Sequence, residues 1–155
     1  MDLNTQSPRS PRTLFAGVAG LARTTDKARA FLAGTLGDFH YGYECPHDWA
    51  VFDVLGIDGA KYATMVARLG DDSAIEAWVH EHYVSKNPPE HIAQWNDELL
   101  RCGPDFAPTL FPEGNPLKGL TQEQFAHFLS AIAPERTDVR TVVDLLDIED
   151  GHAAR

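Results

Sequence analysis

The sequence has few cysteines, the residues whose disulfide bonds stabilise small secreted domains, and it has no segment that could cross a bilayer. Only two of its 155 residues are cysteine, Cys45 and Cys102, and no apolar leader precedes them. A reducing, cytoplasmic setting is therefore expected, in which no disulfide is required. No apolar run approaches the roughly 20 residues of a membrane-spanning helix, and Asp2 stands where N-myristoylation needs glycine. We expect neither a spanning nor a lipid-anchored protein.

Positive charge is scarce as well. Acidic residues outnumber basic ones by 23 to 13, which gives a formal net charge of −10 at pH 7. Such an excess repels nucleic-acid backbones and anionic lipids, so we expect neither as a partner. The first thirty residues are the exception, and an anionic small molecule could be attracted there. Their basic residues are Arg9, Arg12, Arg23, Lys27 and Arg29.

The composition fits one domain with a substantial core, since 43% of the residues are hydrophobic and eight are phenylalanine. Residues 1–12 hold Pro8 and Pro11 and are expected to form a mobile N-terminal arm. Residues 13–103 would form the helical core domain. A connector rich in proline and glycine follows over residues 104–120, and residues 121–150 would form a helical extension packed on the core.

Apolar residues recur at helical spacing in seven segments. We expect a mainly α fold, a compact orthogonal bundle of about six or seven short helices with an extended N-terminal arm. A strand is the alternative only over residues 140–146, where two valines are adjacent. The predicted helices cover about 15–32, 48–55, 58–69, 73–83, 87–102 and 121–132, and a last one starts at about 137.

Several helix starts are marked by capping residues. Asp58 is predicted to cap a helix, and Ile57 and Tyr62 flank it as a hydrophobic staple does. Thr121 and Gln124 match a capping box. These patterns predict where two of the helices begin.

The first predicted helix bears a group of charged residues. Arg23, Asp26 and Lys27 follow at i, i+3 and i+4 and so share a face, with Arg29 at its edge. A carboxylate between two cations can hold them as a fork suited to a phosphate or carboxylate. The alternative is a solvated helix face with ordinary ion pairs, which are common and weak.

The aromatic segment 37–49 contains candidate metal ligands. His40, Cys45 and His47 could bind zinc or another transition metal, but their spacing matches none of the compact zinc modules. Surface or core histidines are the alternative, and we predict no cofactor. His80 and His82 cannot chelate together from a regular helix, and only His82 is expected to face the apolar side.

A second candidate site involves polar residues on faces that should be buried. His82 and Asn96 lie on adjacent predicted helices, and leaving either unpaired in the interior would cost about 1–3 kcal/mol. They either satisfy each other or a backbone carbonyl, or they orient a ligand in a cleft with Tyr41, Tyr43 and Trp95. The sequence contains no Gly-rich phosphate loop, serine elbow or dinucleotide-binding motif.

Several short motifs occur together in the first hundred residues. They are Pro8-Arg9-Ser10-Pro11, Leu21-Ala22-Arg23, Asp26-Lys27-Ala28-Arg29-Ala30, Phe52, Gly56-Ile57-Asp58, Asp72, Trp78-Val79 and Trp95-Asn96. Over about residues 7–100, this combination resembles the bacterial domain-of-unknown-function family 5069. The resemblance implies a small, mainly helical bacterial protein with no assigned activity, and it implies that the charged cluster belongs to the family pattern. The loop with His40, Cys45 and His47 and the segment 105–155 are expected to fall outside that pattern.

Small-molecule binding is the function we expect first. The protein would hold an anionic group and could be a cofactor-free enzyme that uses acid and base groups in an aromatic-lined cleft. The residues expected to act are Arg23, Lys27 and Arg29 on the anion, Asp26 as positioning or proton-transfer group, and Tyr41 and His40 as acid or base.

A protein-interaction or regulatory module without catalysis is the alternative. In it the arm and the connector contact a protein partner, and the charged cluster only locks the arm to the first helix. A homodimer through the C-terminal extension would also favour this function. A transition-metal protein that uses His40, Cys45 and His47 is the third candidate.

Overall fold

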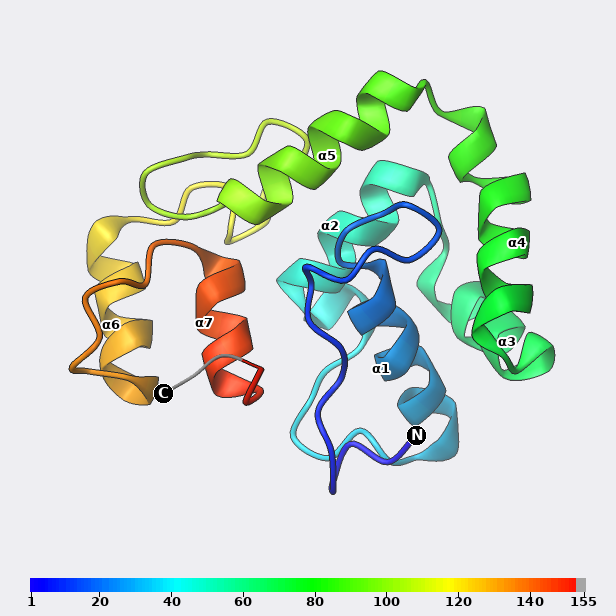
Figure 1. Ribbon diagram of the computed structural model, residues 1–155, viewed down its shortest axis with the longest axis horizontal. Helices are drawn as coiled ribbons and strands as arrows, with labels where there is room; N and C mark the ends of the chain where they lie inside the picture. Colours follow the sequence, from blue (N-terminus) through cyan, green and yellow to red (C-terminus); the bar gives the residue numbers. More distant parts are fainter. Residues whose placement is uncertain (153–155) are drawn as a thin grey trace.

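Seven α-helices make up most of the computed structural model, which describes residues 1–152 (Figure 1). The prediction of a mainly helical fold with six or seven short helices is confirmed, and no strand forms within residues 1–152, where a strand over 140–146 was the alternative. The helices are α1 Leu21–Ala33, α2 Pro46–Leu55, α3 Gly59–Leu69, α4 Asp72–His82, α5 Pro89–Arg101, α6 Gln122–Ile132 and α7 Val142–Glu149, with 3-10 turns η1 Gly42–Glu44 and η2 Val84–Lys86. None of these helices combines the length and the apolar character needed to cross a membrane.

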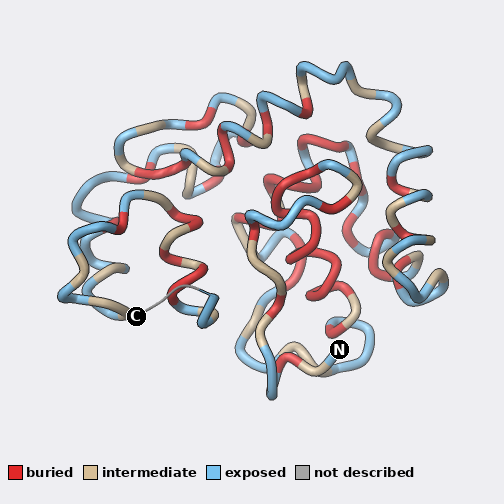
Figure 2. Tube along the Cα trace, in the orientation of Figure 1, coloured by how far each residue is buried: buried red, intermediate tan, exposed pale blue. Residues whose placement is uncertain are grey.

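Helix α1 lies at the centre of the molecule. It packs against α2 and α3, and nine of its residues are buried, including charged ones. Figure 2 shows the buried part of the chain concentrated around α1 and α2. The last turn, with Phe31 and Leu32, is exposed, but the polar residues of the buried part of α1 must find partners inside the protein.

Capping residues mark several helix ends as predicted. The Asp58 side chain accepts a hydrogen bond from the Lys61 backbone N–H, and the staple residues on either side of it are buried. Thr121 and Gln124 form the predicted capping box at the start of α6. Gly34 ends α1 in the left-handed conformation, which glycine adopts without steric cost.

Five helix starts differ from the prediction. Helix α1 begins at Leu21 rather than near Phe15, because Ala16, Gly17 and Gly20 have positive φ angles of 52°, 77° and 86° and break the helical path. The residues before α1 instead form a tight loop closed by a bridge between Phe15 and Val18. The other four differ by a few residues: α2 begins at Pro46 rather than at Asp48, Asp71 rather than Ser73 caps α4, Pro88 rather than Asn87 precedes α5, and Thr141 rather than Thr137 caps α7.

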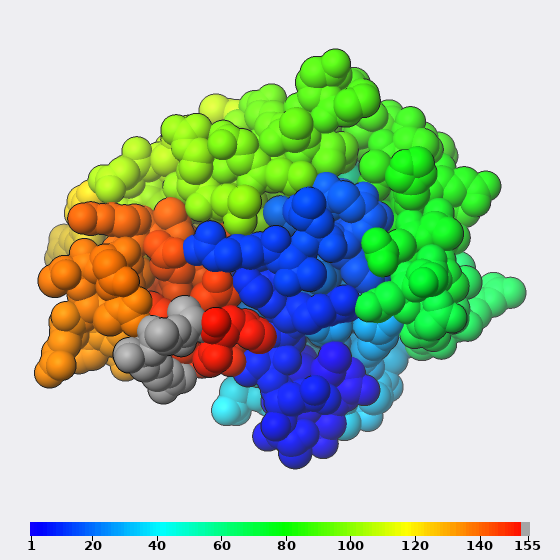
Figure 3. All heavy atoms as spheres, viewed as in Figure 1, coloured from blue at the N-terminus to red at the C-terminus, as the bar shows by residue number. Residues whose placement is uncertain are grey.

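The N-terminal arm lies against the body of the protein. Leu3 and Pro11 are buried; the Leu3 N–H donates to Thr35 O at 2.9 Å, and Pro11 O accepts from the Gly20 N–H at 2.9 Å. Figure 3 shows this segment running from the lower edge to the centre of one face, where it lies between the green α4 region and the red C-terminal helix. The arm expected to be mobile is thus docked along its length.

The C-terminal helices pack at one side of the core. Helix α7 contacts both α5 and α6 and buries Val142, Val143, Leu145 and Ile148. Helix α6 lies on the outside of α7 and buries only Phe125 among its eleven residues (Figures 1 and 2). The extension therefore adds to the core through α7, whereas α6 is covered on one side only.

The connector is held to α5 by a buried carboxylate and an aromatic contact. Glu98 accepts hydrogen bonds from the backbone N–H groups of Thr109 and Leu110. Burial alone would raise the pKa of Glu98, but these bonds and one from Gln94 lower it. The Phe111 ring stacks on Trp95 with centroids 5.4 Å apart, so the connector closes one end of the core.

Candidate functional site

The charged residues of α1 point in three directions instead of forming one fork. Asp26 faces the arm and also pairs with Arg29, Lys27 faces α2, and Arg23 pairs with Asp150 near the C-terminus. Arg23, Asp26 and Lys27 are each less than 5% exposed. The structure therefore shows neither the shared fork nor the solvated face that the i, i+3, i+4 spacing suggested.

Asp26 is the centre of an ionic network that fixes the arm. It accepts from Arg9 through the backbone N–H (2.8 Å), Nε (3.0 Å) and Nη2 (3.0 Å), and from Arg29 Nη1 (3.4 Å). Arg9 and Arg29 also pair with Asp72, at 2.9 and 2.8 Å. Burial alone would raise the pKa of Asp72, but the two guanidinium groups lower it. This arrangement is the arm lock that the interaction-module alternative expected.

A second set of contacts joins the arm to α7. Arg12 Nε lies 2.9 Å from Asp147 Oδ2, and its Nη2 pairs with Asp144. The Ser10 hydroxyl donates to Asp147 Oδ1 at 2.6 Å, and His152 Nε2 lies 2.6 Å from Pro8 O. The arm thus links α1 and α4 on one side to α7 on the other, although the arm and α7 are more than a hundred residues apart in the sequence.

A buried ion pair joins α1 to the start of α2. Lys27 Nζ lies 2.8 Å from Asp48 Oδ2, and both side chains are almost completely buried. The Thr24 hydroxyl and the Gly42 N–H also donate to the Asp48 carboxylate, at 2.8 and 3.2 Å. Burial raises the pKa of Asp48, but Lys27 and His47 outweigh that effect and hold it well below its usual range. Asp48, where this helix was expected to start, lies in the first turn of α2, and its side chain anchors the interior pair.

The predicted metal ligands are only partly brought together. His40 is exposed and lies 3.8 Å from Glu44, away from the others, whereas Cys45, His47 and Asp48 place ligand atoms within 4.8 Å of one another. Lys27 Nζ, however, sits 3.1 Å from Cys45 Sγ and 2.8 Å from Asp48. An ammonium group bound to two of three ligands occupies the place of a metal cation, so the residues present do not favour one.

The other predicted site residues support the fold locally. The Tyr41 hydroxyl donates to Gly59 O at 2.6 Å, and burial raises its pKa, while Tyr43 is exposed. His82 is exposed too, with Nδ1 2.9 Å from Trp78 O; the expectation that it faces the apolar side is wrong. Ile75 and Val79 of the same face are buried, but α4 ends at His82, so its last turn projects beyond the core.

Trp95 and Asn96 hold the loop before α1. Trp95 Nε1 donates to Ala19 O at 2.9 Å. The Asn96 amide accepts from the Ala19 N–H at 2.8 Å and donates to Gly17 O at 3.0 Å. Asn96 and His82 thus satisfy backbone groups rather than each other, and Tyr41, Tyr43 and Trp95 do not line the cavities along α6 or beside Gly17.

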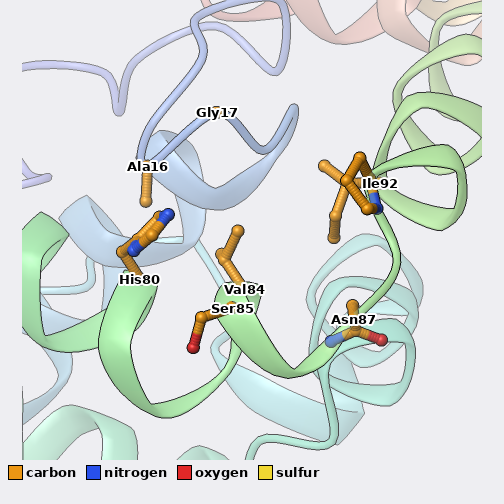
Figure 4. Close-up of a pocket in the computed structure, with 8 residues that line it drawn as sticks. Ala16, Gly17, His80, Val84, Ser85, Asn87 and Ile92 are labelled. Carbon is orange, nitrogen blue, oxygen red and sulfur yellow. The ribbon is translucent and has the colours of Figure 1, made fainter.

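One open cavity of about 590 Å³ lies between the loop at Ala16 and Gly17 and the turn from α4 to α5 (Figure 4). Its polar side chains include His80, Ser85 and Asn87. Ser85 and Asn87 already donate to backbone carbonyls of their own turn. Few polar groups are therefore left to orient a small molecule there.

An apolar groove runs along α6, and sequence reasoning missed it. Two cavities of about 450 and 320 Å³ share Leu117, Leu120 and Phe128 as lining residues, and we call this surface the α6 groove. Phe128 follows the buried Phe125 at i+3 on α6, but it is 53% exposed. Acidic Glu123 lines one cavity and Glu149 the other. The helical spacing of the apolar residues of α6 could be read from the sequence, but the sequence does not show that the rest of the protein covers them only in part.

Comparison with known proteins gives a family without an assigned activity. A search of curated proteins finds no significant match. The family described as domain of unknown function (DUF5069) matches residues 5–152. The match includes the loop with His40, Cys45 and His47 and continues through α6 and α7, so the expectation that the family pattern stops near residue 100 is wrong. By this match across nearly its whole length, the chain belongs to the DUF5069 family.

Proposed function

We propose that the protein is an interaction module that binds an amphipathic helix of a partner protein in the α6 groove. The supporting observation is the half-covered apolar stripe of α6. Phe125 is buried, but Phe128 is half exposed between two cavities. Exposed apolar surface with a polar rim is typical of protein-binding sites.

A helix is the occupant that this groove fits best. Two neighbouring helices, α6 and α7, line the smaller cavity of the groove, α6 continues along the larger one, and Leu117 and Leu120 of the connector line both. A third helix can lay apolar residues at i, i+3 and i+7 into such a groove. Because Glu123 and Glu149 lie at the groove and the chain carries −10 net charge, the partner helix should have basic residues beside its apolar stripe.

The small-molecule function expected from the sequence has less support. It required free cations near Asp26, and the cations of α1 are paired with carboxylates of the protein itself. The cavities along α6 and beside Gly17 are not lined by Asp26, Lys27 or Tyr41. The two unpaired cysteines support a reducing, cytoplasmic setting for the interaction.

The proposal can be tested with a designed peptide, since the partner is unidentified. The peptide is about 14 residues long, or roughly 21 Å as a helix, with leucine at i, i+3 and i+7 and lysine or arginine elsewhere. Its binding is followed by fluorescence anisotropy against the full chain, and a scrambled peptide of the same composition controls for charge. We expect the designed peptide to bind with a micromolar Kd and the scrambled peptide not to bind.

Two variants locate the binding surface. Phe128→Gln removes the apolar contact of the groove, and Leu14→Gln removes an apolar side chain of similar exposure elsewhere. A bound peptide can bury the exposed half of the Phe128 side chain, and this burial contributes about 1 to 1.5 kcal/mol to the binding free energy. The Phe128→Gln substitution should therefore weaken peptide binding about tenfold. Equal weakening by both variants, or equal binding of the scrambled peptide, would contradict the proposal. A chain that dimerises, and that Phe128→Gln makes monomeric, would show that a second copy is the occupant instead.

A further inference from the structure

Helix α7 has two opposite faces with different neighbours, and Figure 1 shows it between α6 and the N-terminal arm. One face lines the smaller cavity of the α6 groove. The residues of this face follow at i, i+3, i+4 and i+7, and they are Val142, Leu145, Leu146 and Glu149. Asp144 and Asp147 lie on the opposite face, where they contact the arm. One short helix therefore separates the groove from the arm.

Arm residues hold both carboxylates on that opposite face. Asp147 is 6% exposed, and its carboxylate accepts from the Ser10 hydroxyl at 2.6 Å and from Arg12 Nε at 2.9 Å. Arg12 also pairs with Asp144, the capping-box residue that bonds to Thr141 at the start of α7. If the arm left, the buried Asp147 carboxylate would lose these two hydrogen bonds, at a cost in free energy. The arm thus supports the first two turns of α7.

The same stretch of the arm is anchored to the core. Arg9 binds Asp26 of α1 through its backbone N–H at 2.8 Å and through its side chain. Two residues further on, Pro11 O accepts from the Gly20 N–H at 2.9 Å. The proline ring restricts the backbone between these anchors and Arg12. Displacing this stretch from the core therefore also moves the groups that hold α7.

Helix α7 depends on such support because it is short. It has eight residues, and isolated helices of fewer than about 12–15 residues are marginally stable in water. It packs against α5 and α6, but its groove face meets the half-exposed Phe128. A partner that binds a loosened α7 must first order that helix, and this ordering reduces the affinity.

We infer that the docked arm regulates partner binding in the α6 groove by holding α7 in place. This inference rests on the function proposed for the groove. Docking orders the α7 side of the groove before the partner arrives, so the partner binds more tightly. By thermodynamic linkage, a bound partner favours docking of the arm by the same factor. The arm and the groove are thus two coupled sites, with Arg12 as the positioning residue.

Arg12→Gln tests the coupling, because it removes the bonds from the arm guanidinium to Asp144 and Asp147. Arg68→Gln is the matched control, since Arg68 is an exposed residue of α3 and its loss changes the net charge equally. Loss of a cation by itself strengthens the attraction for the designed basic peptide, so weaker binding cannot come from charge. We expect fluorescence anisotropy to show about fivefold weaker peptide binding by the Arg12→Gln chain than by the Arg68→Gln chain.

The reverse effect is measured in the wild-type chain by NMR hydrogen exchange. The N–H groups of Leu3 and Gly20 report docking, because each forms a hydrogen bond between the arm and the core. Their exchange proceeds through the small fraction of chains with an undocked arm. Saturating peptide should slow both about fivefold, whereas the Lys61 amide at the exposed start of α3 should not change. Destabilisation by a mutation cannot produce this effect, because no residue is changed.

Either of two results would overturn the inference. One is equal peptide affinity of the Arg12→Gln and Arg68→Gln chains, and the other is unchanged exchange of the Leu3 and Gly20 amides in the presence of peptide. Both leave the groove function standing, provided that the wild-type chain binds the peptide. A wild-type chain that binds no peptide would overturn the proposed function and its regulation together, so the wild-type measurement distinguishes the two failures.

Discussion

The ionic network at Asp26 can be tested by one isosteric change, Asp26→Asn. Asp26 is 1% exposed and accepts four hydrogen bonds from Arg9 and Arg29. Removing one partner from a fully buried ion pair costs about 3–5 kcal/mol, but Arg9 is one-third exposed and can be rehydrated. We therefore expect the free energy of unfolding to fall by about 2–4 kcal/mol, the range for lost charged hydrogen bonds in a partly wet site.

Urea unfolding followed by circular dichroism measures this loss, and thermal unfolding should show a Tm lower by about 5 to 15 °C. Limited trypsin digestion gives a second readout, since undocking the arm exposes the bonds after Arg9 and Arg12. Asp97→Asn is the control, because Asp97 forms an exposed pair with Arg101 that is worth about 0.5 kcal/mol or less. If Asp26→Asn changes stability no more than the control does, the network does not hold the arm and the structural interpretation fails.

Further predictions concern the buried cluster and the helix ends. Asp48→Asn leaves the Lys27 ammonium unpaired inside the protein and should cost about 3–5 kcal/mol in urea unfolding; a loss under about 1 kcal/mol would contradict the burial of that pair. Because the pKa of His47 is lowered by folding, the unfolded chain binds more protons below about pH 6.5, so stability should fall as pH drops through that value. His47→Gln should flatten this pH dependence, and an unchanged slope would assign it to other groups. Gly20→Ala should destabilise the fold by at least about 1 to 3 kcal/mol, because φ is +86° and a Cβ would lie 2.9 Å from Leu99; an unaffected Tm would refute this.

Local features of the fold could be predicted because they depend on neighbouring residues. Asp58 caps α3 and Thr121 caps α6, as the residue types and spacings indicate. The start of α1 was predicted too early, since the positive φ of Ala16 follows from how the loop packs, which its residue type does not reveal. Sequence periodicity thus gave the number and order of helices better than their first residues.

The candidate sites could not be predicted for a different reason. Arg23, Asp26 and Lys27 are close in sequence, so spacing placed them together on a face. Their partners, however, come from segments far away in the chain, such as Asp48 and Asp150, and these draw the side chains apart. Periodicity also cannot show that α6 lies at the edge of the fold, which leaves the apolar stripe of that helix half covered.

The most direct test of the proposed function is to map where the basic amphipathic peptide binds. Amide signals of the labelled chain would be assigned and followed by NMR as the peptide is added. Binding in the α6 groove predicts shifts at residues 117–132 and 142–149 that saturate together, with the arm and α3 unaffected. Shifts centred on the arm or on α3 and α4, or no saturating shift at any residue, would contradict the interaction function proposed for this groove.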